Sequence, residues 1–193
     1  MRIEEMTIPG TFLITPDQLP DDRGVFFEAM RCDRLAGAGI DFTPRQINYS
    51  VSKRHTLRGL HSVSIPPGQA KFVTCVRGAL RDIVVDLRIG SPAFGRHQVS
   101  ELTAESGRSV YVPEGVGHGF LALTDDACIC YVVSSTYVPG TQIDINPLDP
   151  ELDLPWNCPE PPLISEKDAK APTLAEAVAA GLLPVLPGPK EQP

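Results

Sequence analysis

The residues best suited to chemistry stand close together in one stretch of the chain. Arg58 and His61 belong to the run Leu57-Arg58-Gly59-Leu60-His61, and Lys71 follows ten residues later, after a Pro-Pro-Gly turn. A single histidine at the edge of a strand is more often a structural hydrogen-bonding group than a catalyst. The two cations favour the catalytic interpretation, because arginine and lysine are costly to bury without an anion to meet.

Two further segments carry polar side chains that fit either a functional or a purely structural role. His118 stands between Gly117 and Gly119, which give the backbone freedom and leave space for a ligand, although a histidine that fills a tight hairpin has the same pattern. Tyr131 and Tyr137 fall on one face of a strand with a two-residue period. They indicate either core aromatics or the wall of a pocket that is both apolar and able to donate hydrogen bonds.

Metal and disulfide chemistry is not indicated by the spacing. The four histidines have no partner at ligand spacing, and Val63 stands where a second metal-binding histidine would follow His61. The five cysteines are an odd number and form no Cys-x-x-Cys pair, so they are interpreted as reduced structural residues. The sequence therefore predicts no metal.

Composition excludes several classes of protein. The 193 residues, 42% hydrophobic and 21% charged, predict a folded domain and not a disordered chain. There is no apolar run of membrane-spanning length, and acids occupy the N-terminus where a signal peptide would be apolar, so we expect a cytoplasmic protein. A net charge of −7 disfavours nucleic acid and anionic lipid but leaves room for a small anionic ligand in a local cationic pocket.

Short β-type runs recur about every ten residues, separated by Gly, Pro, Asp or Ser. The predicted strands cover residues 11–15, 24–30, 46–52, 72–77, 81–88, 95–102, 109–112, 119–123 and 128–138. Within 81–88, Ile83, Val85 and Leu87 share one face, and Asp82, Val84 and Asp86 share the other. The pattern predicts an all-β antiparallel sandwich or barrel of the jelly-roll kind.

One helix is predicted, over residues 173–180. Thr173 and Glu176 have the spacing of a capping box, and Gly181 supplies the exit. We expect one jelly-roll domain over residues 1–175, followed by the end of this helix and a Pro-rich tail over 176–193, loose from residue 184 onward.

Taken together, the motifs resemble the dTDP-4-dehydrorhamnose 3,5-epimerase family, in order and nearly in spacing, from about residue 8 to residue 175. The matching segments are Asp22-Arg23-Gly24, Phe27-Glu28, Gln46-Ile47-Asn48, Leu57–His61, Lys71, Val85–Arg88, Gly90-Ser91-Pro92, His118-Gly119-Phe120, Tyr131, Tyr137 and Ser165–Asp168. The resemblance implies a cupin-like jelly roll without a cofactor, a homodimer that exchanges N-terminal strands, and a dTDP-linked 4-keto-6-deoxyhexose as substrate.

The resemblance also assigns roles. His61 matches the base, Asp168 the carboxylate that orients it, Lys71 the cation near the C4 oxygen, and Tyr131 the acid on the opposite face. The positions that match contacts to nucleotide, diphosphate or sugar are Arg23, Glu28, Gln46, Asn48, Arg58, His118 and Lys167, and Tyr137 and Gln142 complete the predicted substrate-binding set.

Departures from the family pattern lie around the sugar and base ends. Ser62 and Val63 replace an aromatic residue and Gln, Gln142 replaces a Glu, and residues 146–149 replace Trp-Asn-Asp. The changes resemble the branch that makes deoxysugars for secondary metabolites such as antibiotics, where some members epimerise one carbon only. The expected activity is therefore epimerisation at C3, C5 or both. The alternatives are a 3,4-ketoisomerase and a catalytically silent sugar-nucleotide binding module.

Overall fold

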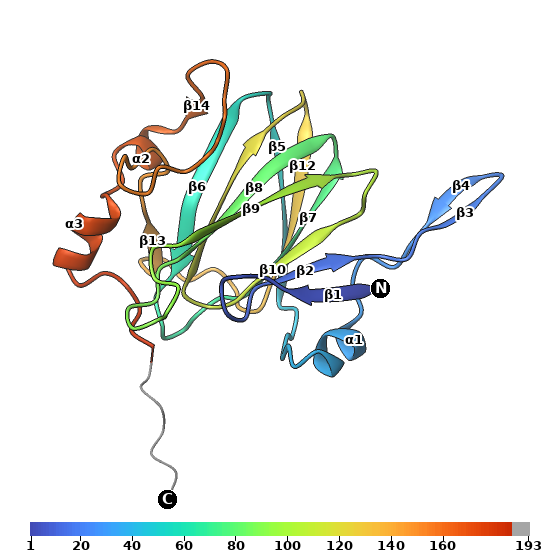
Figure 1. Ribbon diagram of the computed structural model, residues 1–193, viewed down its shortest axis with the longest axis horizontal. Helices are drawn as coiled ribbons and strands as arrows, with labels where there is room; N and C mark the ends of the chain where they lie inside the picture. Colours follow the sequence, from blue (N-terminus) through green and yellow to red (C-terminus); the bar gives the residue numbers. More distant parts are fainter. Residues whose placement is uncertain (187–193) are drawn as a thin grey trace, which may run out of the picture.

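Two antiparallel sheets pack face to face in the computed structural model, which describes residues 1–186 (Figure 1). The first sheet has the strand order β1-β2-β10-β7-β12-β5, and the second has the order β13-β6-β11-β8-β9, with β14 added in parallel to β6. In the first sheet the strands are β1 (Arg2–Glu5), β2 (Phe12–Thr15), β10 (Ser109–Val112), β7 (Lys71–Arg77), β12 (Ala127–Val133) and β5 (Gln46–Ser52). In the second they are β13 (Gln142–Asp144), β6 (Thr56–Val63), β11 (Val116–Ala122), β8 (Ala79–Asp86), β9 (His97–Thr103) and β14 (Leu163–Ile164).

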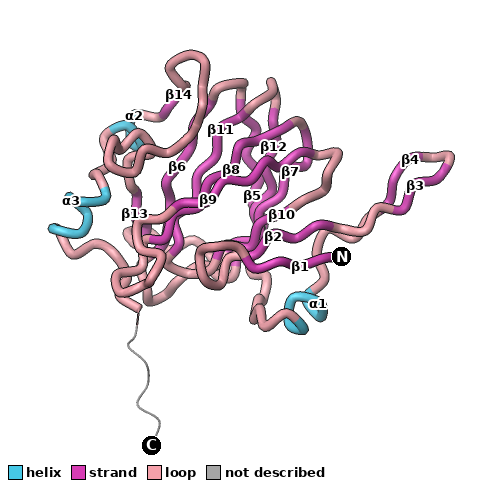
Figure 2. Tube along the Cα trace, in the orientation of Figure 1, coloured by secondary structure: helices cyan, strands magenta, loops and turns pink. Residues whose placement is uncertain are grey.

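The remaining elements lie outside the two sheets. A separate hairpin, β3 (Leu19–Asp21) with β4 (Gly24–Phe26), projects away from the sandwich (Figures 1 and 2). The helices are short and peripheral: α1 (Cys32–Gly37), α2 (Glu166–Ala169) and α3 (Leu174–Ala179). Among residues 1–186, no helix has the length and apolar character needed to cross a membrane. The predicted all-β sandwich is confirmed.

The alternation predicted for residues 81–88 separates two cores. Val84 joins the cluster between the sheets, together with Phe120 and Ile129 from β11 and β12. Ile83 and Val85 point the other way, into a cluster that the C-terminal segment covers. Because alternate residues of a strand face opposite sides, β8 is buried on both faces.

Irregular chain and the helices cover the outer face of the second sheet and part of the outer face of the first, where β5 stays exposed. Trp156 and Ala177 pack on the second sheet in the cluster of Ile83 and Val85. On the first sheet, Leu35 of α1 and Phe42 pack against Phe72 and neighbouring residues. The sandwich is therefore a four-layer arrangement in places, and the C-terminal layer holds α2 beside β6.

Several boundaries differ from the sequence prediction. Strand β12 ends at Val133 and not at residue 138, and β4 ends at Phe26 and not at residue 30. The capped helix is confirmed as α3, with both hydrogen bonds of the capping box present, but two further short helices exist. The prediction of a loose tail from residue 184 is wrong at its start, because Val185 forms a bridge with Ile89. Residues 187–193, the rest of that predicted tail, lie outside the described residues.

The fold brings β6 and β11 unusually close at a pair of glycines. Gly59 has φ +127°, and a Cβ added there would lie 2.5 Å from Cα of Gly119. The pairing register of the two strands shifts at this point, between His118 and Phe120. A side chain at residue 59 would push β6 away from β11 and displace His61, which stands opposite His118.

We expect Gly59→Ala to lower the free energy of unfolding by about 2–4 kcal/mol, because both an unfavourable φ and a backbone clash are introduced. Two control variants separate these causes. Gly90→Ala has the positive φ without the clash and should cost about 1 kcal/mol, and Gly37→Ala has neither and should be neutral or slightly stabilising. Urea unfolding of the three variants gives the comparison. Equal losses for Gly59→Ala and Gly90→Ala would show that the close approach is not a constraint.

Candidate active site

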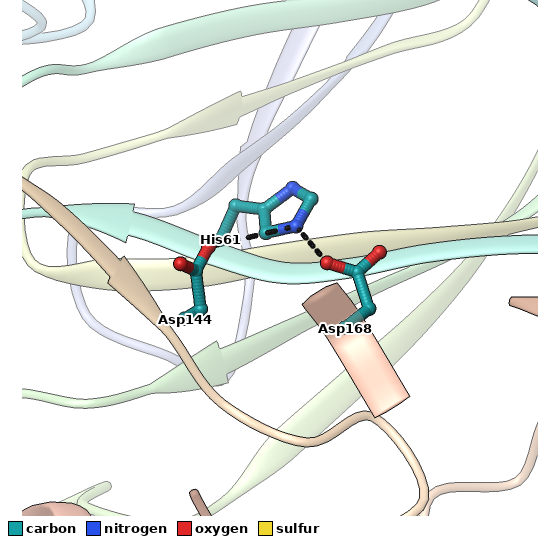
Figure 3. Close-up of side chains that lie close together, drawn as sticks. All are labelled: His61, Asp144 and Asp168. Carbon is teal, nitrogen blue, oxygen red and sulfur yellow. Dashed lines mark hydrogen bonds and ion pairs between the residues drawn. The ribbon is translucent and has the colours of Figure 1, made fainter. Parts of the chain in front are cut away.

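A histidine–carboxylate pair links the middle of the second sheet to the C-terminal segment. Nε2 of His61 on β6 lies 2.8 Å from Oδ1 of Asp168, the buried residue of α2 (Figure 3). Burial raises the pKa of Asp168, but hydrogen bonds from His61 and the Gly59 N–H outweigh it and hold that pKa below its ordinary value. An ionised carboxylate can only accept, so in the neutral imidazole Nε2 carries the proton and Nδ1 has a free lone pair. Nδ1 points away from the carboxylates (Figure 3).

A local capping interaction starts helix α2 and positions Asp168. Ser165 is its N-cap, and its hydroxyl accepts a hydrogen bond from the Asp168 N–H at 3.0 Å. A four-residue helix is too short to produce an apolar periodicity, so only the Ser cap and the acidic first turn could have indicated it.

A second carboxylate, Asp144, reaches the same histidine and was not among the predicted site residues. It stands directly opposite His61 in the register of β13 with β6, and its Oδ1 lies 3.7 Å from Nε2 (Figure 3). Lys167 donates to Asp144 at 2.9 Å and to Gln142 at 3.2 Å. The sequence gives no signal for Asp144, because the contact depends on the pairing of two strands far apart in the chain.

Lys71 begins β7 in the first sheet but reaches across to the second. Its Nζ donates to the main-chain oxygen of His61 at 2.9 Å, and its side chain is buried. Burial lowers the pKa of Lys71 to about 8, although the charges of Asp144 and Asp82 act in the opposite direction. A buried lysine without a contacting carboxylate can serve an anion that arrives with a ligand.

Tyr131 of the first sheet meets His118 of the second sheet, which belongs to a second buried pair. The His118 and Tyr131 rings meet edge to face with centroids 5.9 Å apart, and Nε2 of His118 lies 2.6 Å from Oδ2 of Asp82. Burial, and next the charge of Asp82, raise the pKa of Tyr131 above its ordinary value, so its hydroxyl stays protonated at neutral pH. Tyr131 belongs to the first sheet and His61 to the second, which sets a hydroxyl donor and an imidazole on different sheets.

Three more predicted residues lie beside Tyr131. Asn48 on β5 is opposite Tyr131 in the register of β5 with β12, and Gln46 donates to Asn48 at 2.8 Å. Arg58 on β6 donates to the Ser52 hydroxyl at 3.2 Å, and its charge is close enough to Tyr131 to act on that hydroxyl. Polar groups from β5, β6 and β12 are therefore gathered around one end of the sandwich.

Three predicted residues lie elsewhere or in a different setting. Arg23 sits in the turn of the projecting hairpin with its side chain 90% exposed and pairs with Asp21. Glu28 follows that hairpin and pairs with Arg31. Tyr137 is not on the strand of Tyr131, because β12 ends at Val133; it is exposed, and its N–H donates to Gln46. The prediction of two tyrosines on one strand face is therefore wrong.

The histidine cluster has the composition of a divalent-metal site. Ligand atoms of His61, Asp144 and Asp168 lie within 4.8 Å of one another, which sequence spacing did not indicate. The ammonium of Lys167 is already 2.9 Å from Oδ1 of Asp144, the oxygen that also faces the imidazole. A cation is thus supplied by the chain itself, and a metal ion would have to compete with it.

Two hollows on the surface differ in their relation to this chemistry. A hollow of about 640 Å³ is lined by Leu148 and residues 153–162, and contains none of the predicted site residues. A smaller groove of about 310 Å³ is lined by Gln142, Asp144 and Lys167 among others. His61 does not line the smaller groove, but Asp144, which does, lies 3.7 Å from its imidazole, so the groove begins beside the histidine.

Comparison with known proteins agrees with the geometry. A family model described as dTDP-4-dehydrorhamnose 3,5-epimerase matches residues 5–176. A relative from Streptomyces niveus named dTDP-4-dehydrorhamnose 3-epimerase is 50% identical over 95% of this chain and 89% of its own length.

Solved structures give the same result. NovW, described as a 4-keto-6-deoxy sugar epimerase from the novobiocin biosynthetic gene cluster of Streptomyces spheroides, has a TM-score of 0.93 at 50% identity, covering 96% of this chain and 93% of its own. ChmJ, a 3'-monoepimerase from Streptomyces bikiniensis solved in complex with dTDP-quinovose, has a TM-score of 0.91 at 46% identity, with 94% of this chain and 92% of its own covered.

We expect Lys71→Met to raise the free energy of unfolding near pH 7 by about 1–3 kcal/mol, because it removes a buried ammonium. The folded pKa of about 8 is below the ordinary value of 10.5, so the cost is full below about pH 8 and disappears as the pH rises toward 10.5. Urea unfolding near pH 7 and near pH 10 tests this, with exposed Lys53→Met as control. A gain that persists near pH 10 would contradict the prediction.

Proposed function

We propose that this chain, which belongs to the dTDP-4-dehydrorhamnose 3,5-epimerase family, epimerises a dTDP-linked 4-keto-6-deoxyhexose by proton transfer next to the ketone. The observation that carries the proposal is the placement of a carboxylate-bound imidazole and a protonated tyrosine on different sheets of one sandwich. Inversion at a carbon requires a base on one face of the substrate and an acid on the other.

Removal of the proton is assigned to His61. With Nε2 donating to Asp168, Nδ1 takes the proton from the carbon beside the C4 ketone, and the electron pair of that C–H bond moves onto the C4 oxygen. Asp168 keeps the ring in this tautomer and stabilises the imidazolium that forms. The product of the step is an enolate with a charged oxygen.

Stabilisation of the enolate is assigned to Lys71. Its ammonium is buried, is fixed by the main-chain oxygen of His61, and has no carboxylate within ion-pair distance in the described chain. Negative charge that develops on the ketone oxygen therefore meets a cation that is already in place and shielded from water.

Return of the proton is assigned to Tyr131. Its hydroxyl gives a proton to the face of the carbon opposite His61, and the enolate carbonyl re-forms, which inverts the centre. The phenolate and the imidazolium then exchange protons with solvent. His118, held by buried Asp82, packs edge to face with the tyrosine ring and fixes it.

Binding of the dTDP part is assigned to the polar groups of β5 and β6. Within residues 1–186 the Arg58 guanidinium hydrogen-bonds only to the Ser52 hydroxyl, so it can meet diphosphate oxygens in pairs. Gln46, Asn48 and Tyr137 form a hydrogen-bonded row beside it, and Lys167 and Gln142 lie at the sugar end near His61.

A homodimer that exchanges its N-terminal hairpin completes the proposed site. In one chain, Arg23 lies in the turn of the hairpin β3–β4, which projects away from β6 (Figure 1), and Glu28 follows that hairpin. The hairpin exposes Phe26 at 65%, and the edge strand β5 exposes Tyr49 at 66%, so both carry apolar surface that a second copy would cover. In the dimer, Arg23 would enter the partner's site and meet the diphosphate.

The carbon that is inverted is C3, C5 or both, since matched relatives include a 3-epimerase and the family description names both positions. The two alternatives predict other outcomes. A 3,4-ketoisomerase would give a product with its ketone at C3, and a silent binding module would bind dTDP without exchange of any substrate hydrogen.

In D₂O, we expect the wild-type protein to place deuterium at C3, C5 or both of dTDP-4-keto-6-deoxyglucose. His61→Ala should lower the exchange rate by at least about 10²-fold, because no base remains. Tyr131→Phe should still exchange deuterium but give little inverted product, because the proton then returns from the His61 face. Mass spectrometry and proton NMR locate the label. Normal exchange in His61→Ala would show that the base is misassigned.

We also expect a purified heterodimer of one Arg23→Ala subunit and one His61→Ala subunit to keep about half of the wild-type activity, since one of its two sites is then intact. Both homodimeric variants should be weakly active. Two affinity tags select the heterodimer, and sedimentation gives its mass. If Arg23 acted on its own chain, both sites would carry one defect and the heterodimer would be as weak as its parents.

A further inference from the structure

Asp144 is the one charged group of the histidine cluster that the proposed mechanism leaves without a part. It pairs with His61 across β13 and β6, so both side chains leave the sheet on the same face. Ile143, between Gln142 and Asp144, faces the outer core instead. The two-residue period of β13 therefore aims Gln142 and Asp144 together at Lys167 and the imidazole.

Among the groups that contact one another directly, the charges balance when the imidazole is protonated. Asp144 and Asp168 are two carboxylates around one imidazole, and Lys167 is the one ammonium in contact with them in residues 1–186. With a neutral imidazole the cluster has one excess negative charge. With an imidazolium it is neutral. Lys71 adds a positive charge at the main-chain oxygen of His61, so Asp144 supplies negative charge on the ring side, where a proton taken up by His61 would meet it.

The two carboxylates lie at different distances from Nε2 of His61 and act on the ring in different ways. Asp168 is at hydrogen-bond distance, 2.8 Å, and sets the tautomer, whereas Asp144 is at 3.7 Å and acts through its charge. Lys167 holds Asp144 at 2.9 Å with a side chain that is 55% exposed, so the ammonium is partly screened by water. The carboxylate of Asp144 is 20% exposed and keeps more of its effect on the ring.

We propose that Asp144 is a positioning residue for His61: anchored by Lys167, its carboxylate stabilises the imidazolium that forms when the base removes the substrate proton. The proposal deepens the proposed function and rests on it. Because the interaction strengthens only after proton transfer, its loss should slow the chemical step and leave substrate binding nearly unchanged.

The first test needs no substrate. In ¹⁵N-labelled protein, NMR follows the titration of the His61 ring, which is faced by Asp168 and Lys167 from α2, Asp144 from β13, the Lys71 ammonium from β7 and His118 from β11. Asp144→Asn keeps the size of the side chain and an acceptor for Lys167. We expect it to lower the titration midpoint of His61 by about half a pH unit, because imidazolium loses a neighbouring charge.

The second test is kinetic. Asp144→Asn should lower kcat about 3- to 10-fold with KM and the Kd for dTDP within about 2-fold, and Asp144→Glu should recover part of the rate. Asp41→Asn, an exposed acid on a loop over the first sheet, is the matched control and should change neither kcat nor the His61 midpoint. Lys167→Met separates the anchor from the carboxylate, and we expect it to raise KM.

The outcomes are distinguishable. An unchanged His61 midpoint in Asp144→Asn would overturn the proposal, whatever the enzyme does with sugars. A lower midpoint with unchanged kcat would overturn the catalytic part, and a raised KM with unchanged kcat would make Asp144 only a support for Lys167. If wild-type protein exchanged no substrate hydrogen, the proposed function would fail, and the role of Asp144 in catalysis would fail with it, while the midpoint would still report the contact.

Discussion

The hydrogen bond between His61 and Asp168 joins the second sheet to the C-terminal segment that packs on it. It joins residues 107 positions apart, one in the interior strand β6 and one in a four-residue helix that could not exist alone. Helix α2 is held in place because the C-terminal segment packs Trp156 and Ala177 onto the outer face of the second sheet. The outer core of that sheet thus positions the base. Without the Asp168 contact, solvent would set the tautomer of His61.

The site concentrates groups that oppose folding. Lys71, Asp82 and His118 are all buried, and burying such groups costs free energy unless each finds a partner. Asp82 and His118 satisfy each other at 2.6 Å, but in the described part of the chain the Lys71 ammonium has only a main-chain oxygen as partner. The apolar clusters on both faces of the second sheet supply stability that offsets this cost. The lowered pKa of Lys71 reflects the cost of burying its ammonium, and an anion that binds beside the ammonium reduces that cost.

Sequence reasoning succeeded where the information is local. The alternation at Ile83, Val84 and Val85 and the capping box at Thr173 each depend on a few consecutive residues, and both are present as predicted. It failed at β6, because Gly59 interrupts the alternation at the point where β11 comes closest. Residue type alone pointed to His61, Lys71 and Tyr131, whereas Asp168 and the roles of all four came from resemblance to a family, and their grouping in space could not be read from spacing.

Asp144 shows why the rest was out of reach. Its partner His61 is fixed by the register of β13 on β6, and a shift of one residue would bring the apolar Ile143 to the imidazole instead. No local pattern in a three-residue strand specifies that register. What fixes it is burial of Ile143 in the outer core, a long-range property.

The balance of charge around the site also explains how an acidic protein can bind an anionic ligand. The net charge is −7, and three carboxylates, Asp82, Asp144 and Asp168, lie among the site residues. Each of these carboxylates already contacts a histidine or a lysine, so its negative charge acts mainly on that partner. Arg58, in contrast, makes no ion pair within residues 1–186. A guanidinium left free beside paired carboxylates is a local attraction for diphosphate, and it acts at short range where the overall charge is screened.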